Sequence, residues 1–293
     1  MRAEAPLGAA YTSRGSQISP LEAERSFNPR NNHNFPESPR EFLNVVAREL
    51  PYLPLDMARL AIDYQESLWE YWELRNYLRN AKDELEGDGS PVVILRGWGG
   101  WKGFYDSTIT LVRMKGLDPV IAPSDSILNL DPISSKKDQH WDFIKRVAEE
   151  KGQKVHLWGQ SQGGIEGAVL YAEHPDEFEE YVADFWDWDG PKPRRVNVAV
   201  GIGYIWSHIV YGTDDFKLAG LIETINHLEK RGKVPIHTIY RESDVFLPNG
   251  EPIGVHHESK GSHTGSMVNL RHLDLVFSWM ERARTDSEVI GAT

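Results

Sequence analysis

The chain has 293 residues, of which 40% are hydrophobic and 26% are charged. This composition is typical of a globular protein, and the length suits one large domain with insertions or a domain with an appendage. Lys and Arg number 32 against 44 Asp and Glu, which gives a net charge of -12 and argues against a nucleic-acid partner. The absence of cysteine excludes disulfides, thiolate nucleophiles and cysteine metal sites.

The sequence shows no signal for a membrane or for export. No run of about 18 apolar residues occurs, so no membrane span is expected. The N-terminus lacks the apolar core, roughly 7 to 15 residues long, of a secretory signal. We therefore expect a cytoplasmic protein, although a secreted chain without its signal would look the same.

The first 90 residues are expected to lie outside the main domain. Residues 1–36 are rich in Ser, Pro, Asn, Gly and charge, which predicts a flexible arm. Residues 37–90 predict a helical extension, with one helix from a cap at Ser38 to about Glu49 and a longer one after Pro54. The long helix repeats apolar side chains at spacings of three and four, and it is rich in aromatic residues. We expect three of these to pack on the main domain rather than to bind substrate: Trp69, Tyr71 and Trp72.

From residue 91 to 293 short buried-type strands alternate with helices. Such alternation predicts an α/β domain with a mainly parallel sheet and helices on its faces. The expected strands are 92–95, 119–122, 155–158, 196–200, 235–240 and 252–257. The segment 173–195 predicts a helical piece followed by an aromatic and acidic turn. The segment 201–232 is long and aromatic, which suits a cap over the carboxyl edge of the sheet, where ligands of such folds bind. A plain connection with one extra helix is the alternative.

One stretch, Lys154 to Gly164, organises the chain. The apolar strand stops at Gly-Gln-Ser-Gln-Gly, and a helix takes over at once. A turn this sharp strains its central residue, so the positions two residues away on either side must be small, as Gly159 and Gly163 are. The same turn presents the Ser161 hydroxyl at a helix N-terminus, where developing negative charge is favoured.

A serine nucleophile needs a base and an acid to orient that base. Downstream of such a turn the expected order is Ser, acid, His. Of the eleven histidines, His263 alone lies in a loop of small residues at a junction between strand and helix, so it is the candidate base. Asp244 follows a predicted strand and is the candidate acid, with Glu242 and Asp215 as fallbacks.

Two backbone amides are candidates for stabilising an oxyanion. One is the N–H of Gln162, directly after the serine, and the other is the N–H of Trp98 in the glycine-rich loop after the first core strand. The indoles of Trp98 and Trp101 could line an acyl pocket, or they could simply pack in the core. Aromatic residues of the expected cap extend the candidate pocket: Tyr204 and Trp206.

Four segments carry a resemblance to a known family: VVILRGWGGW, VHLWGQSQGG, YRESDVFLP and GSHTGSMVN, in that order. Together they resemble the α/β-hydrolase superfamily, and within it the bacterial lipase-like and esterase-like members, over residues 91–283. The resemblance implies Ser161 as nucleophile, Asp244 as acid and His263 as base, with Trp98 and Gln162 as oxyanion donors. Arg96 departs from the pattern, because such lipases often carry a histidine there.

The expected activity is hydrolysis of a carboxylic ester with an apolar, lipid-like acyl group through an acyl-enzyme. No metal or other cofactor is expected. The partner would be a small-molecule ester, and the sequence leaves the oligomeric state open. Two alternatives use the same features: an acyltransferase or thioesterase with the same three residues, or a binding protein that keeps the fold without catalysis. The serine argues against the dehalogenase and epoxide hydrolase branches, which use aspartate there.

Overall fold

The structure is a computed structural model that describes residue 47 and residues 53–81, 89–100, 102–125, 129–190, 234–240, 254–258 and 261–291. Four predicted segments lie outside the described residues: the arm at 1–36, the helix at 38–49 apart from residue 47, the strand at 196–200 and the cap at 201–232. The division into arm, helical extension, core and cap therefore stays a prediction.

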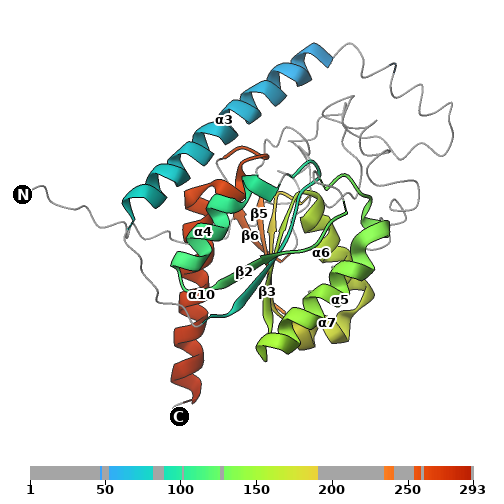
Figure 1. The fold of residues 1–293 in the computed structure, drawn as a ribbon, viewed down its shortest axis with the longest axis vertical. Helices are drawn as coiled ribbons and strands as arrows, with labels where there is room; N and C mark the ends of the chain where they lie inside the picture. The colour runs from blue at the N-terminus through green and yellow to red at the C-terminus, as the bar shows by residue number, and fades with distance from the viewer. Residues whose placement is uncertain are drawn as a thin grey trace, which may run out of the picture.

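A six-stranded sheet forms the centre of the molecule, with the strand order β2-β1-β3-β4-β5-β6 and every neighbouring pair parallel (Figure 1). Because all the strands run the same way, their carboxyl ends lie along one edge. This arrangement confirms the predicted α/β class. The strands are β1 (Pro91–Leu95), β2 (Asp118–Ile121), β3 (Val155–Gln160), β4 (Val182–Trp188), β5 (Ile236–Tyr240) and β6 (Val255–Glu258).

Helices cover both faces of the sheet (Figure 1). One face carries α4 (Asp106–Met114) and α10 (Leu270–Gly291), and the other carries α5 (Ile133–Lys151), α6 (Gln162–Glu173) and α7 (Pro175–Tyr181). The long helix α3 (Leu53–Asn80) crosses obliquely over the side of α4 and α10. Two short 3-10 turns complete the elements: η3 (Lys102–Phe104) and η5 (Ser266–Val268).

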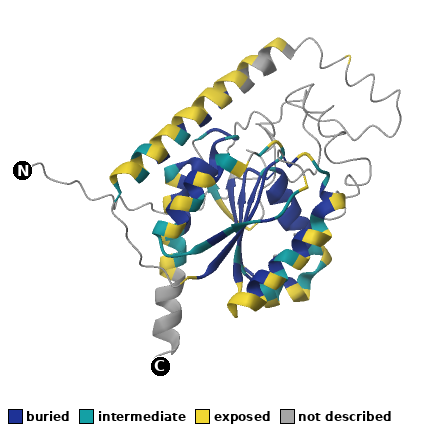
Figure 2. Cartoon of the chain, in the orientation of Figure 1, coloured by how far each residue is buried: buried dark blue, intermediate teal, exposed yellow. Residues whose placement is uncertain are grey.

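The strands are apolar on both faces because helices cover both. In β1, Val93 and Leu95 belong to a core cluster with side chains of α5, α6 and α7. Val92 and Ile94 belong to a second cluster, with side chains of α3, α4 and α10. Alternate residues of a strand point to opposite faces, so one apolar run supplies both clusters. Figure 2 shows the resulting buried centre.

The fourth strand corrects one expectation. The strand that follows the serine helix is β4 at Val182–Trp188, and it pairs directly with β3 and with β5. The sequence pattern predicts residues 196–200 as the next core strand, because the acidic and aromatic run VADFWDW resembles a turn. Its two aspartates are buried with partners: Asp184 contacts the His156 ring at 2.8 Å, and Asp187 accepts from the Gly190 backbone N–H at 3.0 Å. Paired carboxylates can occupy a core strand.

Helix α3 also differs from its prediction. Its inward face carries Asp63, Ser67, Glu70 and Leu74, all buried, and Tyr71 packs beside Phe104 with ring centroids 6.2 Å apart. Trp69 and Trp72 were expected to pack on the domain, but they are 60% and 52% exposed. The inward face of the helix therefore combines apolar side chains with two buried carboxylates, which the apolar spacing does not predict. Within the described residues, no helix is long and apolar enough to cross a membrane.

Candidate active site

Ser161 lies at the tip of a sharp turn between β3 and α6. Its backbone has φ 49° and ψ -113°, a conformation that residues other than glycine rarely adopt. The neighbouring glycines permit the turn: a Cβ on Gly159 would lie 2.5 Å from the Gly163 carbonyl oxygen, and one on Gly163 would collide with the Leu95 carbonyl. The half-buried serine is thus held at the carboxyl end of a central strand and at the N-terminus of α6.

The imidazole of His263 contacts the hydroxyl of this serine. Its Nε2 lies 3.0 Å from Ser161 Oγ, although 102 positions separate the two residues. The ring is only 5% exposed. This distance is within hydrogen-bond reach, which is the geometry that a general base needs to take the hydroxyl proton.

Gln160, directly before the serine, ties the histidine loop to the strand. Its Nε2 donates to the carbonyl oxygens of His263 at 3.3 Å and Thr264 at 3.1 Å. It also lies 3.3 Å from Ser266 Oγ. One side-chain amide therefore fixes the backbone that follows the histidine side chain, a role for Gln160 that the sequence does not predict.

Tyr105 joins Gln160 to the glycine-rich loop. The Tyr105 hydroxyl donates to Gln160 Oε1 at 2.5 Å and accepts from the Gly97 backbone N–H at 3.1 Å. The side chain is fully buried, and burial raises the pKa of Tyr105 to about 12. The hydroxyl therefore stays protonated and can donate and accept at the same time. The sequence does not predict this role, because no local pattern distinguishes a tyrosine that follows a glycine-rich loop and joins distant segments.

The loop that carries Trp98 lies against the serine. A Cβ on Gly97 would lie 3.3 Å from the Gln160 carbonyl oxygen and 3.4 Å from Ser161 Cβ, so the two segments are in close contact at this residue. Arg96 is buried, and its Nη1 donates to the Gly100 carbonyl at 3.0 Å. Burial lowers the pKa of Arg96. Trp98 is half-buried, and its backbone directly follows the anchored Gly97.

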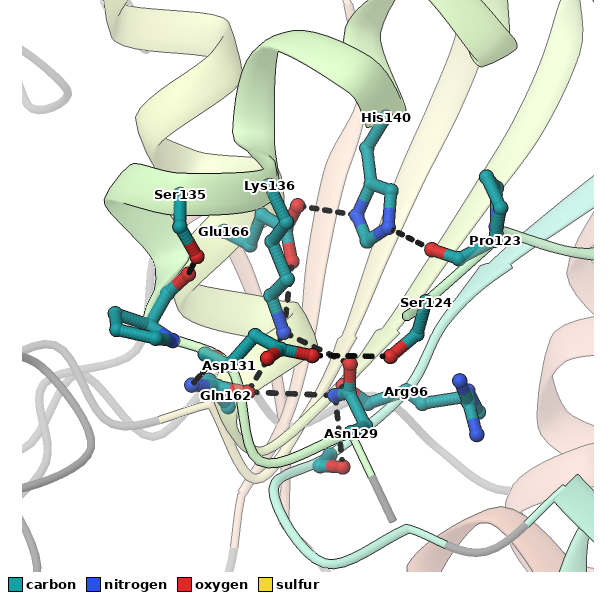
Figure 3. Close-up of polar contacts among 12 residues, drawn as sticks. Arg96, Pro123, Ser124, Asn129, Asp131, Ser135, Lys136, His140, Gln162 and Glu166 are labelled. Carbon is teal, nitrogen blue, oxygen red and sulfur yellow. Dashed lines mark hydrogen bonds and ion pairs between the residues drawn. The ribbon is translucent and has the colours of Figure 1, made fainter. Parts of the chain in front are cut away.

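A buried polar network holds the same loop to the residue after the serine (Figure 3). Asn129 donates through Nδ2 to the carbonyl oxygens of Arg96 at 2.8 Å and Gly97 at 3.0 Å. Lys136 donates through Nζ to Asn129 Oδ1 at 2.9 Å and to Gln162 Oε1 at 2.8 Å. The two segments that carry the candidate oxyanion donors are thus joined through side chains.

The network continues to Glu166 on α6. Lys136 Nζ lies 3.7 Å from Glu166 Oε2, and the His140 ring bridges Glu166 Oε1 and the Pro123 carbonyl (Figure 3). Burial lowers the pKa of Lys136, and the Glu166 carboxylate opposes that shift. Lysine and glutamate are almost never buried unless they are paired, so the pair fits a structural role behind the serine turn.

Several predicted site residues lie outside the described residues, and their placement stays a prediction. These are the acid Asp244, its fallbacks Glu242 and Asp215, and the pocket residues Trp101, Tyr204 and Trp206. Of the predicted set, Ser161, His263, Trp98 and Gln162 are described. Searched over the described residues, the structure contains no group of three or more His, Cys, Asp or Glu side chains that could hold a metal ion.

Sequence comparison alone does not place the chain. No family model matches it, and no curated protein matches it significantly. Solved structures do match. The mature lipase BlEst2 of Bacillus licheniformis aligns with a TM-score of 0.50 and 15% identity, over 68% of this chain and 95% of the lipase.

Two further structures are similar at lower scores. An extracellular α/β-hydrolase from a Paenibacillus species aligns with a TM-score of 0.43 and 14% identity, over 64% of this chain and 97% of the other. The monoacylglycerol lipase of Paleococcus ferrophilus aligns at 0.40 and 16%, over 64% and 94%. With its parallel strand order and its serine turn after the third strand, this chain has the α/β-hydrolase fold.

Proposed function

We propose that this chain is a serine hydrolase that cleaves carboxylic esters through an acyl-enzyme. The observation that carries the proposal is the 3.0 Å distance between Ser161 Oγ and His263 Nε2, at a serine held with positive φ between strand and helix. A structural serine needs neither a strained backbone nor an imidazole at its hydroxyl. The lipase with the same fold supports the choice of ester chemistry.

In the proposed reaction His263 Nε2 takes the proton of Ser161 Oγ while that oxygen attacks the ester carbonyl. The alcohol leaves with the proton from His263. Water then attacks the acyl-enzyme with His263 again as base, which releases the acid and restores the serine. Asp244, four residues after the end of β5 in the sequence, would accept from Nδ1–H and hold the required tautomer.

The oxyanion of the tetrahedral intermediate would accept from the backbone N–H groups of Trp98 and Gln162. Both amides belong to anchored segments. Gly97, before Trp98, is held by Tyr105 and Asn129, and the Gln162 side chain is held by Lys136. Donors fixed before reaction need no reorganisation when the charge develops, which is the condition for strong stabilisation.

The proposed substrate is an ester with an apolar acyl group. The support comes from the sequence, in which Trp98 and Trp101 belong to the glycine-rich loop and Tyr204 and Trp206 belong to the expected cap. An acyltransferase or thioesterase would use the same three residues and differ only in the acceptor or the leaving group. A non-catalytic binding protein would have no need of the serine and histidine at 3.0 Å.

Labelling with a fluorophosphonate probe, combined with hydrolysis of p-nitrophenyl esters of increasing chain length, tests the proposal. We expect labelling at Ser161, and Ser161→Ala should lower kcat by at least about 10⁴-fold. Ser134→Ala is the matched control, because Ser134 is exposed at the start of α5 and should leave kcat unchanged. Wild-type protein that is neither labelled nor active on any ester would reject the proposal. A faster transfer of the acyl group to added alcohol or thiol than to water would favour the transferase.

A further inference from the structure

Helix α3 reaches the histidine loop with two buried carboxylates. Asp63 and Glu70 are seven residues apart, which is two helical turns, so they share one face of the helix. Asp63 is 1% exposed and Glu70 is 8% exposed, while most of the helix surface around them is exposed (Figure 2). Buried carboxylates are costly unless their oxygens accept hydrogen bonds, so their partners indicate what they do.

Asp63 holds the histidine residue by its backbone. The His263 N–H donates to Asp63 Oδ1 at 2.7 Å, and the Thr264 N–H and hydroxyl donate to Oδ2 at 3.2 and 2.8 Å. Three donors from two consecutive residues thus converge on one carboxylate from a helix about 200 positions earlier in the chain.

Glu70 holds the residue before the histidine and the turn after it. Its Oε1 accepts from the Ser262 N–H at 3.1 Å and from Asn269 Nδ2 at 2.7 Å, and its Oε2 accepts from the Ser262 hydroxyl at 2.5 Å. That hydroxyl in turn accepts from the Gly265 N–H at 2.8 Å. Burial raises the pKa of Glu70, while its bonds to Ser262 and Asn269 oppose the rise.

The loop itself, residues 261–265, has little means of holding a fixed shape. It contains two glycines and lies outside the regular helices and strands. A Cβ on Gly261 would lie 2.7 Å from Glu70 Oε1, so the glycine is what lets the carboxylate approach. Hydrogen bonds to charged acceptors are about twice as strong as neutral ones, and here they replace the missing secondary structure.

We propose that Asp63 and Glu70 are positioning residues that hold the His263 imidazole at Ser161, so that the N-terminal helix is part of the catalytic apparatus. The inference rests on the proposed function of Ser161 and His263. It adds that ester hydrolysis by this chain requires α3, a helix that precedes the alternating strands and helices of the core. A displacement of about 1 Å at a reacting group can cost roughly 10²-fold in rate.

The test compares Asp63→Asn and Glu70→Gln with Glu73→Gln, an exposed position on the same helix. In the first two variants an amide N–H₂ group replaces one acceptor oxygen and meets the loop's own donors. We expect kcat on p-nitrophenyl butyrate to fall by about 10- to 100-fold with KM within twofold, and fluorophosphonate labelling of Ser161 to slow in parallel. Glu73→Gln should match the wild type in all three.

Near-ultraviolet circular dichroism at the assay temperature confirms that each variant is folded. Should the carboxylate variants not fold, Ser262→Ala decides, because it removes only the hydroxyl between Glu70 and the Gly265 N–H. We expect it to lower kcat by roughly 3- to 30-fold without changing KM. Folded variants that hydrolyse and label at the wild-type rate would overturn the inference. Wild-type protein that does not label at Ser161 would instead overturn the proposed function.

Discussion

Removal of the Tyr105 hydroxyl is the most direct test of the hydrogen bonds that hold the candidate active site together. Tyr105→Phe removes one oxygen and leaves the ring in place. Two buried groups then lose a partner: the Gly97 N–H, which donates to that oxygen at 3.1 Å, and Gln160 Oε1, which accepts from it at 2.5 Å. An unpaired buried polar group costs about 1 to 3 kcal/mol, so for two such groups we expect a loss of about 2 to 6 kcal/mol in the free energy of unfolding.

The same change should affect catalysis, because Gly97 leads into the Trp98 amide and Gln160 holds the His263 loop. We expect kcat to fall by about 10- to 100-fold. The assays are urea unfolding at pH 7 and steady-state hydrolysis of a p-nitrophenyl ester. Tyr181→Phe is the control, because the Tyr181 hydroxyl bonds to Glu149 at an exposed position and its loss should cost less than about 0.5 kcal/mol.

The pH dependence gives an independent check. Burial raises the pKa of Tyr105 from 10.0 to about 12, so the folded state favours the neutral phenol. This contribution to stability is complete below pH 10 and is lost as the pH rises through 12, a change of about 3 kcal/mol for a shift of this size. The difference between wild type and Tyr105→Phe should therefore shrink over that range. A variant within about 0.5 kcal/mol of wild type at pH 7 would refute the assigned role of the hydroxyl.

Three other changes test the scaffold of the site. Gly163→Ala should prevent folding or displace the serine turn, because the new Cβ would collide with the Leu95 carbonyl; an expressed variant with normal labelling at Ser161 would contradict this. Lys136→Met should cost about 3 to 5 kcal/mol in urea unfolding, since it removes the buried cation beside the Glu166 carboxylate and leaves the carboxylate with its bond to His140, and adding Glu166→Gln should restore part of that loss. Burial lowers the pKa of His272 to about 4, so its contribution to stability is present above pH 6.5 and lost as the pH falls through 4; in His272→Gln, unfolding should depend less on pH over that range, and an unchanged slope would argue against a buried neutral imidazole.

The errors of the sequence analysis share one cause. The sequence predicts a turn at Val182–Trp188, because aspartates usually lie on the surface. The structure has a strand there, since the aspartates have buried partners. The predicted packing of Trp69 and Trp72 is also wrong. Aromatic residues at helical spacing predict a buried face, yet the buried face of α3 carries Asp63 and Glu70. In both places a buried carboxylate is stabilised by a donor that is distant in the sequence.

The sequence by itself determined the parts of this protein whose signals are local. The alternation of apolar strands and helices specifies the α/β class, and Gly159 and Gly163 around Ser161 specify the turn, because backbone sterics act over a few residues. His263 could be chosen from its loop of small residues. The tertiary structure alone decided how these groups are held, since Gln160, Tyr105 and Asp63 act through hydrogen bonds that span 103, 55 and 200 positions. Such bonds depend on how the elements pack together, and a pattern within one segment carries no record of that packing.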